Sequence, residues 1–285
     1  MVKFGVIGDM GTGGTNQRKV AKSLKRMINR EKLSFVVGLG DNIYNCGANS
    51  LDDPQFQNKF EKPYSIISDR IKFYMVLGNH DYGEHYCPKI KDREQFQIQY
   101  GIQSQKQKKK WVMPDEHYSF KRGNCEFFAL NPNIYKLNDK EFKEQLKYMI
   151  PRIKRSKAKW KIAFGHQPWI SVGDHGNAPP KLNRFFEKLM NNGDIDLYMC
   201  GDDHNKQIIE KRVKNGKTVT LLVCGTGGRE VDKPYNLENV QDHDRELLFF
   251  SPYLGISTVE TTDKKLTITI LDVNDKVEYI HEIEK

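Results

Sequence analysis

The feature of this sequence that most constrains its fold is a repeated junction, at which an apolar run ends in glycine and a polar residue follows at once. The apolar runs at residues 34–39 and 71–77 have the length and composition of buried strands. They lead into Gly40-Asp41 and Gly78-Asn79. Glycine lets the backbone turn sharply at a strand end, so the following side chains extend over the carboxyl edge of a sheet. The pattern predicts polar groups gathered along one such edge.

Further junctions of the same kind occur along the chain. Strand-like runs at residues 2–8, 160–164 and 196–200 lead into Asp9, His166 and Asp202. Apolar residues recur at helical spacing over residues 16–30, between the first two strands, which indicates a βαβ unit and the α/β class. A polar residue after one strand is usually a turn cap. Because the junctions repeat at equivalent positions, they indicate one shared functional site.

The rest of the pattern predicts further helices and strands. Helices are expected at residues 54–64, 93–100, 139–150 and 180–190, and strands at 117–122, 125–130, 218–224, 254–260, 265–271 and 276–282. Pro151 is expected to break the helix that begins after Asn138. No repeat, low-complexity tract or Pro/Ser linker divides the chain. We therefore expect a single domain over residues 1–285.

The polar residues at the junctions form a set of oxygen and nitrogen donors. Carboxylates, an amide, a phenol and imidazoles, without thiolates, suit Fe, Mn, Zn or Mg. Two ions that share one carboxylate would let a water ionise near neutral pH and attack phosphorus in line. The candidate residues are Asp9, Asp41, Tyr44, Asn79, His80, His166, Asp202 and His204.

The order of these motifs resembles that of a known family, the calcineurin-like metallophosphoesterases. The blocks are Gly8-Asp9, Gly40-Asp41-Asn42-Ile43-Tyr44, Gly78-Asn79-His80-Asp81, Gly165-His166-Gln167-Pro168 and Gly201-Asp202-Asp203-His204. The tyrosine of the second block, and the stretch from His166 through His175 to Asn205, resemble the purple acid phosphatases, most of all the small tartrate-resistant type. The likeness runs from about residue 3 to about residue 228. It implies a four-layer α/β/β/α sandwich of two mixed sheets flanked by helices.

The resemblance also implies a dinuclear metal centre. Fe is implied at the Tyr44 site, and Fe, Mn or Zn at the other. A phenolate ligand favours a ferric ion and would give violet absorption. The implied ligands are Asp9, Tyr44 and His204 for the first ion, Asp41 as a bridge, and Asn79 and His166 for the second ion, with Asp202 at the remaining ligand position.

The activity implied by the resemblance is hydrolysis of a phosphate monoester by a metal-bound hydroxide. His80 and His175 would contact the phosphate or protonate the leaving oxygen, since histidine titrates near neutral pH. The substrate would be a phosphorylated small molecule or a phosphoprotein, and the protein is expected to be a monomer.

Position 202 departs from the family pattern. The family has Gly-His-x-His where this chain has Gly201-Asp202-Asp203-His204. Aspartate adds negative charge, which favours harder ions such as Mn, Mg or Ca over Zn, or it weakens the second site. Two alternatives to an active phosphomonoesterase therefore remain. One is a phosphatase-like binding or scaffold protein, and the other is a phosphodiesterase or nuclease on the same scaffold.

The net charge of +9 is the observation that keeps nucleic acid among the partners. Basic residues beside a tryptophan, as at residues 106–111, could neutralise and stack on single-stranded nucleic acid. Such runs are more often solvated loops, so nucleic acid is the weaker alternative. The hydrophobic fraction of 38% is enough for a sizeable core, and no apolar run has the length of a membrane span.

The cysteines and the first residues bear on the compartment. The chain has 5 cysteines, an odd number without Cys-x-x-Cys spacing. We expect buried thiols in a reducing compartment rather than a disulfide framework. The opening residues already have the pattern of a strand, so no signal peptide is visible. The expected location is cytoplasmic, or secreted if a leader has been removed.

Overall fold

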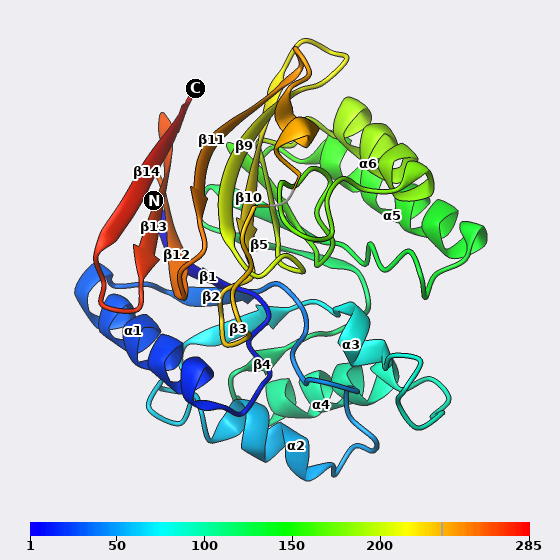
Figure 1. The fold of residues 1–285 in the computed structure, drawn as a ribbon, viewed down its shortest axis with the longest axis vertical. Helices are drawn as coiled ribbons and strands as arrows, with labels where there is room; N and C mark the ends of the chain where they lie inside the picture. The colour runs from blue at the N-terminus through cyan, green and yellow to red at the C-terminus, as the bar shows by residue number, and fades with distance from the viewer. Residues whose placement is uncertain (235) are drawn as a thin grey trace.

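The computed structural model describes residues 1–234 and 236–285 and contains two seven-stranded sheets packed face to face (Figure 1). The first sheet has the order β14-β13-β12-β1-β2-β3-β4, and the second has the order β11-β9-β10-β8-β7-β6-β5. In the first sheet the strands are β1 (Val2–Ile7), β2 (Phe35–Gly38), β3 (Lys72–Met75), β4 (Trp111–Val112), β12 (Gly255–Thr261), β13 (Lys265–Asp272) and β14 (Val277–Glu284). In the second they are β5 (Tyr118–Arg122), β6 (Cys125–Ala129), β7 (Trp160–Phe164), β8 (Leu197–Cys200), β9 (Lys206–Arg212), β10 (Thr218–Cys224) and β11 (Arg245–Ser251).

Both sheets are mixed, and each contains four neighbouring parallel strands. Strands β1 to β4 run parallel to one another, whereas β12, β13 and β14 are antiparallel additions beside β1. In the second sheet β6, β7, β8 and β10 run parallel, with β5, β9 and β11 antiparallel at the flanks. Because neighbouring parallel strands end on the same side, each sheet presents a row of carboxyl ends.

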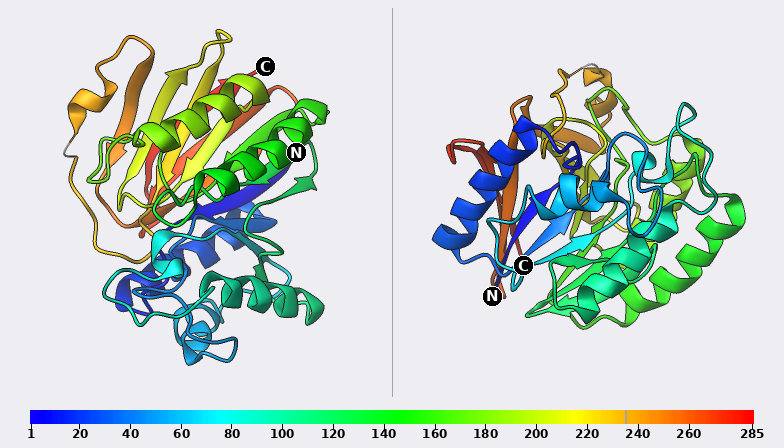
Figure 2. Two further views of the ribbon diagram at one scale, coloured as in Figure 1. Left: turned by 90° about the vertical axis from the view of Figure 1, so that its right-hand side faces the viewer. Right: turned by 90° about the horizontal axis from the view of Figure 1, so that it is seen from below.

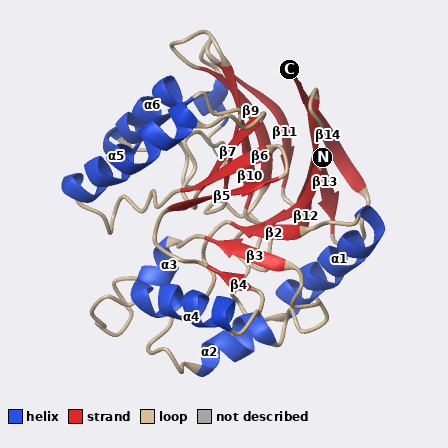
Figure 3. Ribbon diagram, turned by 180° about the vertical axis from the view of Figure 1, so that it is seen from behind, coloured by secondary structure: helices blue, strands red, loops and turns tan. Residues whose placement is uncertain are grey.

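Helices cover the outer faces of the two sheets (Figures 1 and 2). The helices are α1 (Thr15–Glu31), α2 (Pro54–Phe56) continued by a π-helical turn (Gln57–Glu61), α3 (Asn79–Tyr82), α4 (Glu94–Lys106), α5 (Asp139–Arg155) and α6 (Pro180–Gly193), with a 3₁₀ turn at Leu237–Val240. Figure 3 shows α5 and α6 on the second sheet and α1, α2 and α4 on the side of the first.

Alternation along the buried strands explains the four layers. In β8, Leu197 and Met199 belong to the large core between the two sheets, whereas Tyr198 and Cys200 belong to the core beneath α5 and α6. Successive side chains of a strand point to opposite faces, so a strand that is apolar throughout needs cover on both sides. The fold class expected from the family resemblance is thereby confirmed.

The predicted elements are present in the structure, but strands β4, β9 and β11 were not predicted, and helix α5 ends later than expected. Helix α5 runs through Pro151 to Arg155, so the expected break is wrong. Pro151 lies on the exposed face, where losing one backbone hydrogen bond does not end the helix. Strand β9 was not expected because Lys206 and Lys211 interrupt its apolar pattern, yet both lysines are buried and form ion pairs with Glu278 and Asp244.

The cysteines give a second correction. Cys46 and Cys87 form a disulfide, although they are 41 residues apart. Cys125, Cys200 and Cys224 are buried free thiols, as expected. The expectation of thiols alone is therefore wrong for the first pair.

The lysine-rich run before β4 does not present its tryptophan to a ligand. Trp111 is fully buried in the first core, and Lys110 is buried in an ion pair with Asp69. The Trp111 ring is therefore not available for stacking on a base. In the part of the chain that the structure describes, no helix combines the length and the hydropathy that crossing a membrane requires.

Candidate metal centre

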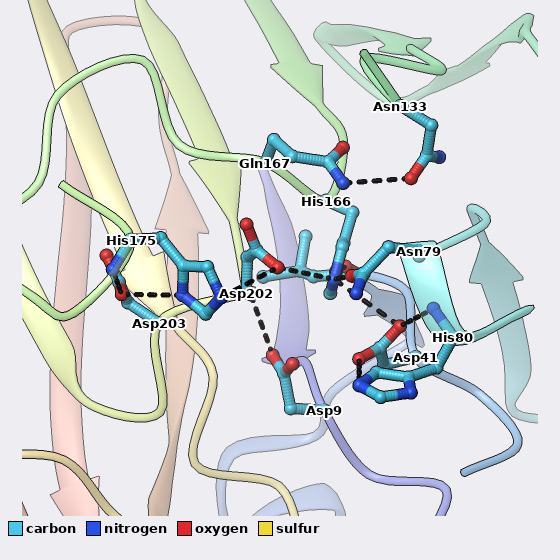
Figure 4. A network of polar contacts seen from close by, with 12 residues as sticks. Asp9, Asp41, Asn79, His80, Asn133, His166, Gln167, His175, Asp202 and Asp203 are labelled. Carbon is cyan, nitrogen blue, oxygen red and sulfur yellow. Dashed lines mark hydrogen bonds and ion pairs between the residues drawn. The ribbon is translucent and has the colours of Figure 1, made fainter. Parts of the chain in front are cut away.

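The carboxyl ends of the parallel strands bring candidate residues together, as Figure 4 shows for Asp41, Asn79 and His166. The ligand atoms of Asp9, Asp41 and His166 lie within 4.8 Å of one another, and all three side chains are buried. Asp9 follows β1, Asp41 follows β2, Asn79 opens α3 after β3, His166 follows β7, and Asp202 and His204 follow β8. Residues up to 195 positions apart in the sequence thus lie in one cluster, as the repeated junctions predict.

The backbone at these junctions is unusual in the same way at three positions. Asp9, Asp41 and Asp202 have φ angles of 56°, 52° and 69°. Aspartate adopts this left-handed region more readily than most residues, but such a conformation still costs free energy and tends to persist at functional sites. Gly78 is required for another reason, since a Cβ there would lie 2.1 Å from Oδ1 of Asp41.

The first half of the centre consists of Asp9, Tyr44 and His204. The Tyr44 hydroxyl donates to Oδ1 of Asp9 at 2.9 Å and lies 3.2 Å from Nε2 of His204. Nε2 of His204 is 3.6 Å from the same carboxylate oxygen. Asp232 approaches Nδ1 of His204 at 3.2 Å and so fixes which ring nitrogen faces the centre.

The second half consists of Asp41, Asn79, His166 and Asp202. Nε2 of His166 lies 2.9 Å from Oδ1 of Asn79 and 3.4 Å from Oδ1 of Asp41. It also lies 3.2 Å from Oδ1 of Asp202. The other ring nitrogen, Nδ1, donates a hydrogen bond to the carbonyl of Leu39 at 2.8 Å. Nε2 is therefore the nitrogen that faces the carboxylates and could bind a metal ion.

His80 and His175 stand at the rim of the centre rather than within it. Nε2 of His80 is 3.9 Å from Oδ2 of Asp41, and its Nδ1 donates to the carbonyl of Asn45 at 2.8 Å. Nε2 of His175 is 3.9 Å from Asp202, and its Nδ1 lies 3.0 Å from Oδ1 of Asp203. In each ring Nδ1 is held by a hydrogen bond, and Nε2 faces a carboxylate of the centre.

Burial and the clustered carboxylates shift the pKa values of several groups. Burial raises the pKa of the Asp9 carboxyl. Burial, together with the charges of Asp41 and Asp9, raises the pKa of the Tyr44 phenol well above its usual value. Burial alone would lower the pKa of His166, but Asp41 and Asp202 outweigh it and hold that pKa well above its usual value. A cation that bound here would therefore displace protons from these groups.

The pKa of His175, at the rim of the centre, depends mainly on one neighbour, Asp202. The charge of Asp202, followed by the hydrogen bond to Asp203, raises the pKa of His175 to about 10. In return, although burial opposes the effect, His166 and His175 hold the pKa of Asp202 well below its usual range. Asp202 is therefore an ionised carboxylate between two imidazoles.

Sequence reasoning did not assign the residues that hold these side chains in place. Asp81 is fully buried and accepts from the backbone amides of Asn42, Ile43 and Gly78, which fixes the two ligand-bearing loops against each other. The sequence signal that could have identified Asp81 is its place at the end of the Gly78-Asn79-His80-Asp81 block. Asp232 lies far from any strand-end motif, so only the fold brings it to His204.

The donor set fits metal ions on chemical grounds. Carboxylate, amide, phenol and imidazole donors lie close together, and most are buried, which is the arrangement of oxygen and nitrogen donors that a metal ion requires. Asp41 lies between the two halves, with His80 and His166 near its oxygens. The buried Asp9, Asp41 and His166 cluster thus matches a metal centre.

The comparison with known families agrees with this geometry. The sequence model of the calcineurin-like phosphoesterase family matches residues 2–206, and the chain belongs to that family. The resemblance inferred from the order of the motifs is thereby confirmed.

Particular relatives narrow the likeness further. The chain is 29% identical to purple acid phosphatase 4 of Arabidopsis thaliana over 291 residues, which cover 96% of this chain and 80% of that protein. It is 24% identical to tartrate-resistant acid phosphatase type 5 of Homo sapiens over 305 residues, covering 96% and 88%. The structure of GAP50, the anchor in the inner membrane complex of Plasmodium, is similar with a TM-score of 0.81 at 22% identity, covering 99% of this chain and 88% of that one. At that identity it shows the shared fold.

Proposed function

We propose that the protein is a metal-dependent phosphomonoesterase of the purple acid phosphatase kind. The observation that carries the proposal is the convergence of Asp9, Asp41 and His166 within 4.8 Å, flanked by donors on both sides. The substrate is a phosphorylated small molecule or a phosphoprotein. Inorganic phosphate is one product.

The donor sets suggest which ions would be held. Asp9, Tyr44 and His204 would hold Fe, and Asn79, His166 and Asp202 would hold Fe, Mn or Zn, with Asp41 shared. Asp202 replaces an imidazole by a carboxylate and shifts the preference of the second half toward harder ions such as Mn. When bound, two such ions would lower the pKa of water and neutralise the charge on the phosphoryl group.

The rim histidines His80 and His175 would contact the phosphoryl group and protonate the leaving oxygen. Nδ1 of His80 donates to the carbonyl of Asn45, so Nε2 is the ring nitrogen that would face a phosphoryl oxygen. Asp203 anchors His175 through both the backbone amide, at 2.8 Å, and Nδ1. The anchored ring keeps Nε2 available to protonate the leaving oxygen.

Metal analysis and turnover test the proposal together. Purified protein would be loaded separately with Fe, Mn and Zn, its metal content measured, and hydrolysis of an aryl phosphate followed. Two ions per chain and release of phosphate are expected. One ion or none, with no hydrolysis after loading, would overturn the proposal.

A scaffold protein is the second candidate, and Asp202 is the observation that favours it. This residue stands where the family pattern has histidine, and its carboxylate faces His166 and His175 rather than solvent. A related protein of the same fold, GAP50, is described as an anchor in a membrane complex. For this candidate we expect the first half to bind metal while aryl phosphate is not hydrolysed, even when Mn or Zn is supplied in excess.

The disulfide bears on where the protein would work. Cys46 and Cys87 join the loop after Tyr44 to the loop after His80, both next to the metal centre. Disulfides persist in oxidising compartments. We therefore propose an extracellular or luminal location, which labelling of free thiols in freshly prepared protein would test.

A further inference from the structure

A glycine-rich turn after β10 lies against the metal centre without supplying any of the donors described above. The amide of Gly227 donates to the carbonyl of Gly8 at 2.9 Å, and the amide of Gly8 donates to Cys224 at 2.9 Å. A Cβ on Gly227 would lie 2.2 Å from the Gly8 carbonyl oxygen, so this close approach requires glycine. The turn is thus fixed beside the end of β1, immediately before Arg229.

Arg229 leaves this turn and extends over a candidate metal ligand. Its guanidinium carbon lies 4.7 Å from the centre of the Tyr44 ring. The ring of His80 contacts Tyr44 as well, at a centroid distance of 4.7 Å. Arg229 is half-buried, and within the described residues its side chain forms no ion pair or hydrogen bond. A guanidinium stacked on a ring keeps its N–H donors free in its own plane.

A pocket beside Arg229 reaches the first half of the centre at His204. It has a volume of about 600 Å³, and its walls include Arg229, His175, His204 and Thr12. Three carboxylates also line it. Asp232 is engaged by His204, whereas Asp174 and Glu230 are exposed at the rim. Among the wall residues, Arg229 is the permanent cation next to Tyr44.

We propose that Arg229 binds the phosphoryl group of the substrate from the Tyr44 side of the centre. This inference rests on the proposed function and names a residue for it. The guanidinium donates two N–H groups to the non-bridging phosphoryl oxygens, as arginine does in bidentate contacts with phosphate. His175 faces the same pocket, and His80 contacts the Tyr44 ring on which Arg229 is stacked.

The charge of the site explains why a fixed cation is useful here. Asp202 adds a carboxylate where the family pattern has a neutral or cationic imidazole. A phosphate monoester is a dianion near neutral pH, so an added carboxylate disfavours its binding. Arg229 offsets that repulsion without occupying a metal-ligand position. Its charge does not depend on pH in the working range of the enzyme.

The test is binding of inorganic phosphate to the metal-loaded protein by titration calorimetry, beside the hydrolysis of an aryl phosphate. The variants are Arg229→Gln, Arg229→Lys and Arg152→Gln. Arg152 is the matched control, because it is also half-buried and stacked on a tyrosine, Tyr148, at 3.4 Å. Metal content and melting temperature are measured for each variant.

We expect Arg229→Gln to weaken phosphate binding by about 10–100-fold and to raise KM by a similar factor. Metal content and melting temperature should stay at their wild-type values. Arg229→Lys should recover only part of the loss, since lysine keeps the charge without the fork of donors. Arg152→Gln should bind phosphate as the wild type does.

The outcomes separate the inference from the proposed function. Unchanged phosphate affinity in Arg229→Gln, or loss of metal from it, would overturn the inference even if hydrolysis is robust. A wild-type protein that binds phosphate through Arg229 but hydrolyses nothing would overturn the proposed function and leave the inference standing. Absence of phosphate binding by the loaded wild type would overturn both.

Discussion

The two halves of the candidate metal centre differ in how closely they keep to the family pattern. The first half, Asp9, Tyr44 and His204, has each donor type that the pattern implies, and Tyr44 touches both of its partners. The second half keeps Asn79 and His166 but has Asp202 in place of histidine. A change of chemistry in one half has left the other half intact. The two halves share Asp41, and the backbone amide of Asp202 also joins them through its hydrogen bond to Asp9.

In this comparison the backbone sets where a candidate ligand lies at the sheet edge, whereas the side chain sets its chemistry. Asp202 holds the place of an imidazole because its amide donates to Oδ2 of Asp9 at 3.1 Å, a backbone contact that any side chain would permit. The side chain then decides which ion the half prefers. The predictions below probe this separation, beginning with the largest expected effect.

Asp41→Asn should affect both halves. The shared carboxylate would become a neutral amide, and we expect metal content and hydrolysis to fall, the latter by about 10³-fold or more. Tyr44→Phe is the matched variant, because it removes a donor from the first half only. Metal analysis with aryl phosphate turnover measures both. If Asp41→Asn depletes one ion and spares the other, the halves are not joined through this residue.

Reduction of the Cys46–Cys87 disulfide should loosen the loops that serve the two halves. The bond spans a separation of 41 residues. Loss of such a cross-link lowers the free energy of unfolding by about 3–4 kcal/mol. Urea denaturation of oxidised and reduced protein measures this change, with Cys125→Ala as a control for a buried free thiol. Equal stability in the two redox states would contradict the prediction.

Asp81→Asn should act on both halves through the backbone. The carboxylate accepts from the amides of Asn42, Ile43 and Gly78, so an amide in its place would turn donors toward donors. We expect hydrolysis or metal affinity to fall by about 10–100-fold. Asp139→Asn, at the exposed start of α5, serves as control. An unchanged rate would show that the loops hold their positions without Asp81.

Asp202→His should act on the second half alone and have the smallest effect. An imidazole would shift the preference of that half from Mn toward Zn by about 10-fold. Competition between the two ions, measured by metal analysis, gives the ratio directly. The absorption that depends on Tyr44 and Fe should not move. If the Mn to Zn ratio is the same in both proteins, the side chain at position 202 does not reach the ion.

Much of the fold and of the site was readable from local pattern. The strands that lead to Asp9, Asp41 and Asn79 are largely apolar, and glycine marks their ends, so both the strand and its exit are encoded within a few residues. The same holds for His166 after β7. Where burial and local pattern agree, the sequence suffices.

The remaining features depend on contacts between distant segments. Strand β9 looks polar because it contains Lys206 and Lys211. Lys206 can be buried because it pairs with Glu278, which lies more than 70 positions away. Asp232 and Arg229 lie beyond the motif-bearing junctions, and only the packing of the turn after β10 brings them to His204 and Tyr44. The disulfide joins cysteines whose spacing has no recognisable signature.

The left-handed backbone at position 202 also limits how the site can vary. A φ of 69° is accessible to glycine and, among residues with a Cβ, mainly to asparagine, aspartate and histidine. Aspartate and histidine codons differ by one nucleotide. A lineage with this loop can therefore exchange a hard ligand for a softer one in a single step, without remodelling the surrounding chain, and follow whichever metal its surroundings supply.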